Sequence, residues 1–235
     1  MRFCEQLIKK CFSLINSFTS IFTIRIIRGT LTVEKEGRKE VNTYDYARMV
    51  ALRLIAQEIK EKGLVGNVAE LGVYRGEFAS RINKEFPDKT LYLFDTFEGF
   101  DEKDISVEKE NLYSDGSEDF SRTTVDLVLK QMKYPHQCCV VKGYFPKSIA
   151  MLHEEERENL QFCFVSIDVD LYQPIYEGLC FFYPRLCKGG QILVHDYNSV
   201  TYKGVKNAVR RFSNETNVAF VPLPDVHGSV VITKI

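Results

Sequence analysis

The sequence predicts an α/β fold: a mostly parallel, seven-stranded sheet with helices on both faces and an antiparallel C-terminal hairpin at one edge. Three observations predict it. Short apolar segments alternate with amphipathic segments of helical length, which is the pattern of βαβ units. Residues 161–169 are almost continuously apolar, as expected for a parallel strand buried on both faces. The chain closes with two β-rich segments, 218–223 and 228–235, which a turn can join into a hairpin.

The remaining elements follow in order along the chain. Five parallel strands are predicted at residues 67–73, 90–95, 138–143, 161–169 and 191–196. Helices are predicted at residues 44–62, 76–86, 121–134, 174–190 and 203–215. Gly63 and Pro87 follow the first two helices, where glycine and proline commonly end a helix. Residues 96–121 are rich in Asp, Glu, Ser and Gly and are predicted to form a long lid or substrate loop.

The composition is that of an ordinary globular protein. The 235 residues suffice for one α/β domain with a short extension, and 45% of them are hydrophobic. The net charge of -1 shows no basic surplus, so no nucleic-acid partner is predicted. Seven cysteines, an odd number without a CxxC pair, indicate a reducing compartment with neither a disulfide framework nor a zinc site. The predicted location is therefore cytoplasmic.

Residues 1–40 are predicted to be an amphipathic helical extension of a domain formed by residues 41–235. Within residues 1–29, apolar side chains recur at helical spacing, but no uninterrupted apolar run approaches the roughly 20 residues of a membrane span. We favour a helical arm that packs on its own domain or on a partner subunit, as in a homodimer. The alternative is a helix that lies on the inner face of the membrane as a peripheral contact.

The first strand turns into its helix at Glu70-Leu-Gly72-Val-Tyr-Arg-Gly76. Gly72 permits a tight turn, and Gly76 lets the helix approach the strand and a ligand closely. The spacing E-x-G-x-x-x-G differs from the G-x-G-x-x-G that binds a pyrophosphate, which disfavours a nicotinamide oxidoreductase. S-adenosylmethionine (SAM) has no phosphate but carries a sulfonium cation and a zwitterionic amino acid end. The carboxylate of Glu70 can attract this positive charge or bind the amine.

The second strand ends at Asp95, where an acidic side chain can accept hydrogen bonds from both ribose hydroxyls of an adenosyl group. The alternative for Asp95 is a cap of the following turn. Together with residues 72–76, hereafter the glycine turn, Asp95 predicts an adenosine-containing ligand. The predicted cofactor-binding residues beside Glu70, Gly72, Gly76 and Asp95 are Tyr74, Arg75, Thr96, Phe97 and Asp168.

Acidic and imidazole side chains end the next two strands. Asp168 and Asp170 close the fourth strand, and their side chains would point to the same side if the chain is still extended there. His195 and Asp196 end the fifth strand. Because these strand ends share the ligand-binding edge of a parallel sheet, we expect three carboxylates and one imidazole to converge. A divalent cation would relieve their repulsion, whereas the alternative is that each Asp caps the following helix.

The chain resembles the macrocin O-methyltransferase (TylF/MycF/NovP-like) family of sugar-modifying enzymes. The resemblance runs from about Tyr44 to about Phe212 and rests on ELGVYRGEFA, LYLFDTFEGF, VKGYFPKSI, SIDVDLYQPIYEGL and GGQILVHDY. The FDTFEGF and DVDLY elements are more specific than the glycine motif. The resemblance implies a Rossmann-like class I methyltransferase that uses SAM and Mg²⁺ to methylate a hydroxyl of a sugar or glycosylated acceptor.

The same resemblance implies roles for individual residues. By motif position, Asp168 would bind the metal, Asp170 would be the general base, and the pair before Tyr197 would supply the remaining metal ligands. Family members usually carry two acids in that pair, whereas this chain has His195-Asp196. Imidazole suits manganese, iron or zinc better than magnesium. Either the metal differs, with Mn²⁺ as an alternative, or His195 takes a catalytic or substrate role instead.

Two other functions stay open. Catechol and caffeoyl-CoA methyltransferases also use acids at these two strand ends, so a small phenol could replace the sugar as acceptor. A non-catalytic SAM-binding subunit is the third candidate. The presence of all three acids, Asp168, Asp170 and Asp196, argues against it.

Overall fold

The computed structural model describes residues 10–11, 14–15, 17 and 45–235. The chain divides into two units, residues 1–42 and 43–235. In the first unit the described residues are helical, and the rest of the predicted N-terminal extension lies outside the described residues. No helix within the described ranges is long and apolar enough to cross a membrane.

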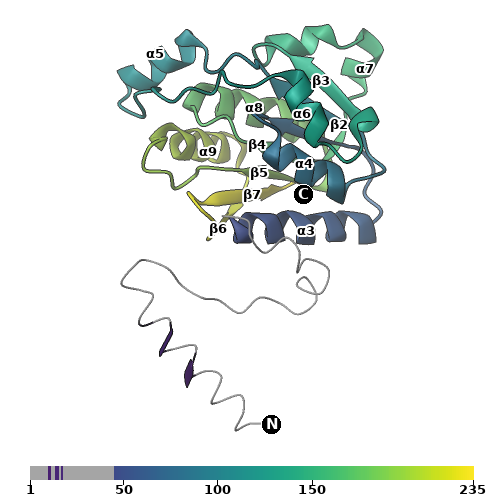
Figure 1. Ribbon diagram of the computed structural model, residues 1–235, viewed down its shortest axis with the longest axis horizontal. Helices are drawn as coiled ribbons and strands as arrows, with labels where there is room; N and C mark the ends of the chain where they lie inside the picture. Colours follow the sequence, from purple (N-terminus) through teal and green to yellow (C-terminus); the bar gives the residue numbers. More distant parts are fainter. Residues whose placement is uncertain (1–9, 12–13, 16, 18–44) are drawn as a thin grey trace. The chain divides into compact units, whose positions relative to one another are not determined.

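A seven-stranded sheet forms the centre of the second unit (Figure 1). Its strands are β1 (Asn67–Leu71), β2 (Leu91–Asp95), β3 (Cys138–Lys142), β4 (Phe162–Ile167), β5 (Leu186–Val194), β6 (Phe220–Leu223) and β7 (Ser229–Thr233). Their order is β3-β2-β1-β4-β5-β7-β6. Strands β1 to β5 pair in parallel, and β7 runs antiparallel to both β5 and β6. The predicted parallel sheet with an antiparallel C-terminal hairpin is confirmed.

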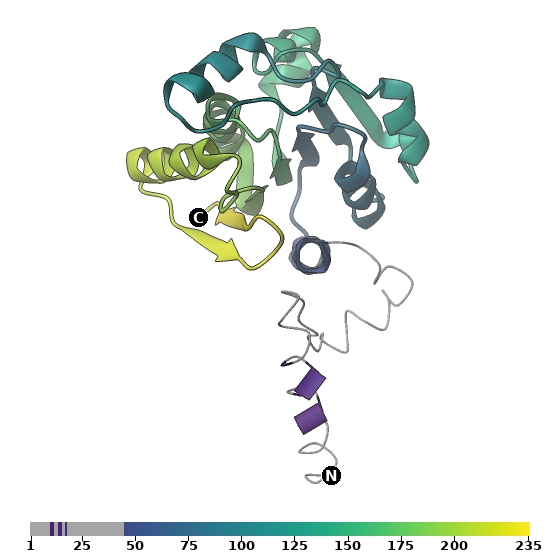
Figure 2. The same cartoon turned by 60° about the vertical axis from the view of Figure 1, so that its left-hand side comes forward.

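Helices cover both faces of this sheet, as Figure 2 shows with α3 seen end-on. One face carries α3 (Tyr46–Glu61), α4 (Glu77–Glu85) and α6 (Val125–Gln131), and the other carries α8 (Tyr172–Arg185) and α9 (Lys203–Thr216). In β2, Leu91 and Leu93 pack under the first set, whereas Tyr92 and Phe94 pack under the second. This alternation follows from the period of two in a strand, so a strand covered on both faces is apolar throughout.

Shorter helical elements lie in the connections. They are α5 (Glu102–Glu110), α7 (Glu154–Glu158) and the 3-10 turns η2 (Pro135–Gln137) and η3 (Lys147–Met151). The prediction of an unbroken loop over residues 96–121 is wrong, because α5 lies within it. Helix α5 has almost no apolar stripe, and its contact with α8 is polar. The carboxylate of Glu108, 0% exposed, accepts a 2.7 Å hydrogen bond from the backbone N–H of Tyr172 at the start of α8.

The predicted helix over residues 174–190 is also wrong at its end. Helix α8 stops at Arg185, and β5 begins at Leu186. Gly189 and Gly190 do not end a helix but lie within β5, where the pairing with β4 shifts register. Gly189 has φ +83°, a conformation open to glycine, so the pair permits a bulge.

Candidate active site

Four adjacent strands end at one level of the sheet. Their last paired residues are in register across β2, β1, β4 and β5, namely Phe94, Leu71, Ile167 and Val194. Backbone hydrogen bonds of 2.8 to 3.0 Å continue one residue further. The next residues therefore form a row along the carboxyl edge of the sheet, which consists of Asp95, Gly72, Asp168 and His195. The structure thus brings the predicted cofactor residues and the predicted chemical residues to the same edge.

Gly72 is the point of closest approach between β1 and β4. It has φ +86°, and a Cβ atom at this position would overlap the carbonyl oxygen of Asp168 and lie 2.6 Å from its carbonyl carbon. Only glycine fits such a contact. Gly76, the N-cap of α4, has φ +82°, but its close neighbours are Val128 of α6 and Met132, the C-cap of that helix. Its close approach is therefore to α6, not to the strand as predicted.

Asp95 organises the glycine turn. Its Oδ2 accepts backbone hydrogen bonds from Val73 at 2.6 Å and Tyr74 at 2.8 Å, and its Oδ1 accepts one from Phe97 at 2.6 Å. Each carboxylate oxygen has two acceptor sites, so these bonds leave capacity for a ligand hydroxyl. Asp95 thus caps the following turn only through the bond from Phe97, and its two other bonds hold the glycine turn. It is half-buried and not the solvent-exposed cap of the alternative, and its free acceptor site is compatible with a ribose role.

Tyr74 and Arg75 contact the segment that follows α5. The Tyr74 ring meets Phe120 edge-on at 5.1 Å between centroids, and the Arg75 guanidinium lies 5.3 Å from the centroid of the Tyr74 ring. The Nε of Arg75 donates to the carbonyl of Arg122 at 3.1 Å. The glycine turn and residues 120–122 thus pack against each other beside the strand ends.

The two residues after Asp95 turn their side chains elsewhere. The hydroxyl of Thr96 donates to the carbonyl of Gly99 at 2.8 Å and closes a local turn. The Phe97 side chain is 5% exposed and lies in the core under α3 and α4. Their predicted cofactor contacts would therefore have to come from backbone atoms.

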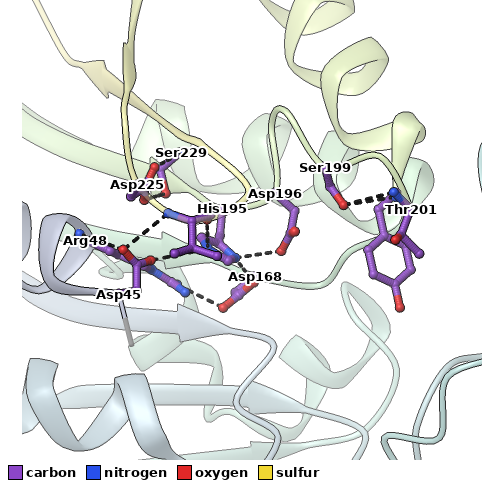
Figure 3. A network of polar contacts seen from close by, with 11 residues as sticks. Asp45, Arg48, Asp168, His195, Asp196, Ser199, Thr201, Asp225 and Ser229 are labelled. Carbon is purple, nitrogen blue, oxygen red and sulfur yellow. Dashed lines mark hydrogen bonds and ion pairs between the residues drawn. The ribbon is translucent and has the colours of Figure 1, made fainter. Parts of the chain in front are cut away.

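His195 is the centre of the polar network at the end of β5 (Figure 3). Its Nδ1 lies 2.6 Å from Oδ2 of Asp196 and 3.2 Å from Oδ1 of Asp168, and its Nε2 lies 3.0 Å from the carbonyl oxygen of Val226. Because a carbonyl oxygen only accepts, Nε2 must carry a proton. In the neutral ring, Nδ1 then directs a lone pair at two negatively charged carboxylates, which is unfavourable. A second proton or a cation at Nδ1 would remove this repulsion.

The electrostatics of the network follow from this arrangement. Burial opposes the charged form of His195, but the carboxylates of Asp168 and Asp196 outweigh it and raise the pKa of His195 to about 10. The salt bridges to Arg48 and His195 overcome the burial of Asp168 and hold its pKa well below the usual range. Protons and arginine therefore balance the negative charge of this cluster when no metal ion does so.

The same atoms fit a divalent cation. Asp168, His195 and Asp196 each offer one ligand atom, and these atoms lie within 4.8 Å of one another. Metal-binding histidines usually donate their other ring N–H to a carbonyl or carboxylate, as His195 does to Val226. A cation at Nδ1 would resolve the contact between this lone pair and the two carboxylates.

Asp170 reaches the cluster through an irregular backbone. Strand β4 ends at Ile167, and Asp170 has φ +60°. The chain is therefore not extended at Asp170, and the condition under which Asp168 and Asp170 would point to one side is not met. Burial and the nearby charges of Asp168 and Asp196 nevertheless raise the pKa of Asp170 well above its ordinary value.

Arg48 and Asp45 are functional candidates that the sequence reasoning missed. The Nη2 of Arg48 donates to Oδ2 of Asp168 at 2.9 Å, and the arginine side chain is only 7% exposed. Asp45 caps α3 and accepts a 3.3 Å bond from the backbone of Val226, and its Oδ2 lies 3.9 Å from Nε2 of His195. A signal was present: Arg48 occupies the buried stripe of α3 together with Leu52, Ile55, Ala56 and Ile59. A charged residue in such a stripe needs a buried partner.

Glu70 lies in β1 behind the glycine turn and is 1% exposed. No side chain within the described residues hydrogen-bonds its carboxylate, and only the backbone N–H of Ala79, in the first turn of α4, interacts with it. Burial and the charge of Asp168 raise the pKa of Glu70 well above its ordinary value, while Arg48 opposes the shift. A buried acceptor without a partner costs roughly 1–3 kcal/mol, so this group fits a ligand that brings a cationic donor, such as the amine of SAM.

Comparison with known proteins adds a family and several similar folds. The model of the macrocin O-methyltransferase (TylF) family matches residues 42–233. No match was found by sequence among curated proteins. The solved structure of the O-methyltransferase NovP is 17% identical, with a TM-score of 0.61 over 80% of this chain and 79% of that one.

Two further structures show the same fold. A TDP-rhamnose 3'-O-methyltransferase of calicheamicin biosynthesis is 17% identical, with a TM-score of 0.55 over 79% of this chain and 78% of that one. The O-methyltransferase TomG from Streptomyces achromogenes, in complex with SAM, is 12% identical, with a TM-score of 0.53 over 95% and 99%. The predicted class I methyltransferase fold is confirmed by these likenesses.

Proposed function

The chain belongs to the macrocin O-methyltransferase family and is a SAM-dependent O-methyltransferase, and we propose that it methylates a sugar hydroxyl with the help of a divalent cation. The observation that carries the proposal is the position of His195, whose Nδ1 faces Asp168 and Asp196 beside the glycine turn. Support for a sugar or glycosylated acceptor comes from the family and from the similar TDP-rhamnose 3'-O-methyltransferase.

The proposed chemistry needs a base and a means of activating the acceptor. An O–CH₃ bond forms as the S–CH₃ bond breaks, and the proton of the acceptor hydroxyl passes to the carboxylate of Asp170. An alcohol with a pKa of roughly 15 is a weak nucleophile, and a cation, when bound, would supply Lewis-acid polarisation of its oxygen. Asp168, His195 and Asp196 would hold the cation. His195 is a poor candidate for the base, because its Nδ1 is directed at two carboxylates and its Nε2 at Val226.

An acceptor panel tests this function directly. With labelled SAM, we expect methyl incorporation into a sugar from a pool of nucleotide sugars and glycans, and not into catechols or other small phenols. Addition of a chelator should abolish the transfer, and re-addition of Mg²⁺ or Mn²⁺ should restore it. Methylated phenol as the product would replace the sugar proposal by the catechol-type alternative. Full activity in the chelator would remove the metal from the mechanism.

The metal preference gives a second test. Imidazole favours Mn²⁺ over Mg²⁺, whereas three carboxylates suit Mg²⁺. We expect titration calorimetry to show tighter binding of Mn²⁺ than of Mg²⁺ to the wild type. His195→Asp should lower the Mn²⁺-to-Mg²⁺ affinity ratio by about tenfold or more, since it restores an all-oxygen set. His153→Asp, which makes the same change at the N-cap of α7, is the control and should leave the ratio unchanged. An unchanged ratio in His195→Asp would show that His195 is not a ligand.

The remaining expectations stay proposals. We propose residues 41–235 as the catalytic domain and residues 1–40 as its extension. A role of residues 1–29 in dimer formation, or alternatively in peripheral membrane contact, is a proposal, and most of these residues lie outside the described ones. The cytoplasmic location rests on the composition alone.

A further inference from the structure

Arg48 lies against both sides of the glycine turn. Its guanidinium carbon is 3.8 Å from the ring centroid of Phe78, which is in the first turn of α4 directly after the glycine turn. Its Nη2 donates to Asp168, the residue whose backbone is in contact with Gly72. The guanidinium is therefore held between the end of β4 and the start of α4, next to the glycine turn that is proposed to bind the cofactor.

The hydrogen-bonding capacity of this arginine is mostly unused. A guanidinium carries five N–H donors, yet within the described residues the only hydrogen bond from its side chain is the one to Asp168. The Nε atom is buried and has no partner. The carboxylate of Glu70 is also buried, with no side-chain hydrogen bond within the described residues and only the backbone N–H of Ala79 beside it, and its charge acts on Arg48. An arginine with spare donors in α3 and a buried acid in β1, both next to the glycine turn, are an arrangement that a zwitterionic ligand would complete.

Other cations near the turn are less suited to an anion. The Nε of Arg75 is bonded to the carbonyl of Arg122. The Nδ1 of His195 is directed at Asp168 and Asp196, and its Nε2 at Val226. Arg48 is thus the buried cation beside the glycine turn with donor capacity to spare. Its planar fork matches a carboxylate, which it can bind through two parallel N–H bonds.

We infer that Arg48 binds the carboxylate of the amino acid end of SAM, opposite Glu70, which receives the ammonium group. The inference rests on the use of SAM and is independent of the acceptor and of the metal. By this inference Arg48 is a cofactor-binding residue that contacts one particular group of the ligand, its carboxylate. A purely structural arginine would instead affect every ligand through the fold of the turn.

A pair of ligands separates these two roles. SAM and decarboxylated SAM differ only in the carboxylate, and each can be titrated calorimetrically into the enzyme without acceptor. For Arg48→Met we expect affinity for SAM to fall about 10- to 100-fold, the range for a lost charge-assisted hydrogen bond. Affinity for decarboxylated SAM should change by less than about threefold, because the group that Arg48 binds is missing. The ratio of the two affinities is therefore the result to be measured.

Two further variants complete the experiment. Arg48→Lys keeps the positive charge but loses the planar pair of N–H donors. We expect it to change the ratio of the SAM and decarboxylated SAM affinities in the same direction, by a smaller factor. This variant also serves as the test if Arg48→Met folds poorly. Arg53→Met, on the same helix, breaks an ion pair with Glu85 (3.5 Å) and should leave the ratio at the wild-type value. Equal weakening of both ligands in the Arg48 variants, or no weakening of SAM, would overturn the inference. Failure of the wild type to bind either ligand would instead contradict the use of SAM.

Discussion

Replacing Asp170 by asparagine is expected to abolish methyl transfer while SAM still binds at wild-type strength. Asparagine has nearly the same size and tolerates the left-handed conformation that Asp170 adopts at φ +60°, so the backbone should not move. It cannot take up the proton of the acceptor. Loss of a general base typically lowers turnover by roughly 10²- to 10⁴-fold. Steady-state kinetics at saturating acceptor give kcat, and calorimetry gives the Kd for SAM.

The matched control for this variant is Asp101→Asn. Asp101 is the N-cap of α5, a position that asparagine fills equally well, so the same chemical change there should leave kcat and the Kd for SAM unaltered. If Asp170→Asn turns over within about threefold of the wild type, far less than the loss of a base would cause, Asp170 is not the base. If it loses SAM binding as well, its role is structural or in cofactor binding.

The substitution Gly72→Ala is expected to destroy the site and to destabilise the domain. The added methyl group would overlap the carbonyl oxygen of Asp168, so the end of β1 or β4 must move. The alanine would also have to adopt φ +86°. Such backbone strain costs roughly 1–3 kcal/mol, and overpacking costs a similar amount. Because Asp168 also pairs with Arg48 and His195, its displacement would disrupt the whole cluster. Thermal unfolding and SAM titration measure the two effects.

Gly189→Ala separates strain from overlap. Gly189 has φ +83°, close to that of Gly72, but the nearest atom to an added Cβ is the Cδ1 of Leu64 at 3.5 Å, an ordinary contact. This variant should lose stability through the backbone alone and bind SAM normally. The additional loss in Gly72→Ala is then the effect of the contact with Asp168. Equal unfolding midpoints and equal SAM affinities for the two variants would show that the contact does not matter.

The residues at the carboxyl edge of the sheet were predictable because parallel strands all end at the same edge. Strands buried on both faces are recognisable as apolar runs, and the chain must leave each run at the same edge. Glu70, Asp95, Asp168 and His195 could therefore be assigned to one region without knowledge of their side-chain contacts. The hairpin was predictable in the same way, from two β-rich segments and the turn between them.

The parts that escaped prediction depend on contacts between distant segments or on local backbone geometry. The place of Arg48 in the apolar stripe of α3 signals a buried charge, but its partner Asp168, 120 positions away, cannot be identified from helical spacing. Helix α5 lacks an apolar stripe, and its Glu108 accepts a hydrogen bond from the backbone of α8, which periodicity cannot reveal. The left-handed conformation of Asp170 breaks the alternation on which the strand argument relied.

The residues around His195 come from segments near the beginning and near the end of the domain's sequence. Asp45, at the start of α3, accepts a hydrogen bond from Val226 in the final turn, 181 positions later, and both residues lie beside the imidazole. A polypeptide leaving the ribosome could form β1 to β4 and the glycine turn well before this last segment is translated. The imidazole would lack its orienting carbonyl until then, so catalytic competence should be acquired only when synthesis of the domain is nearly complete.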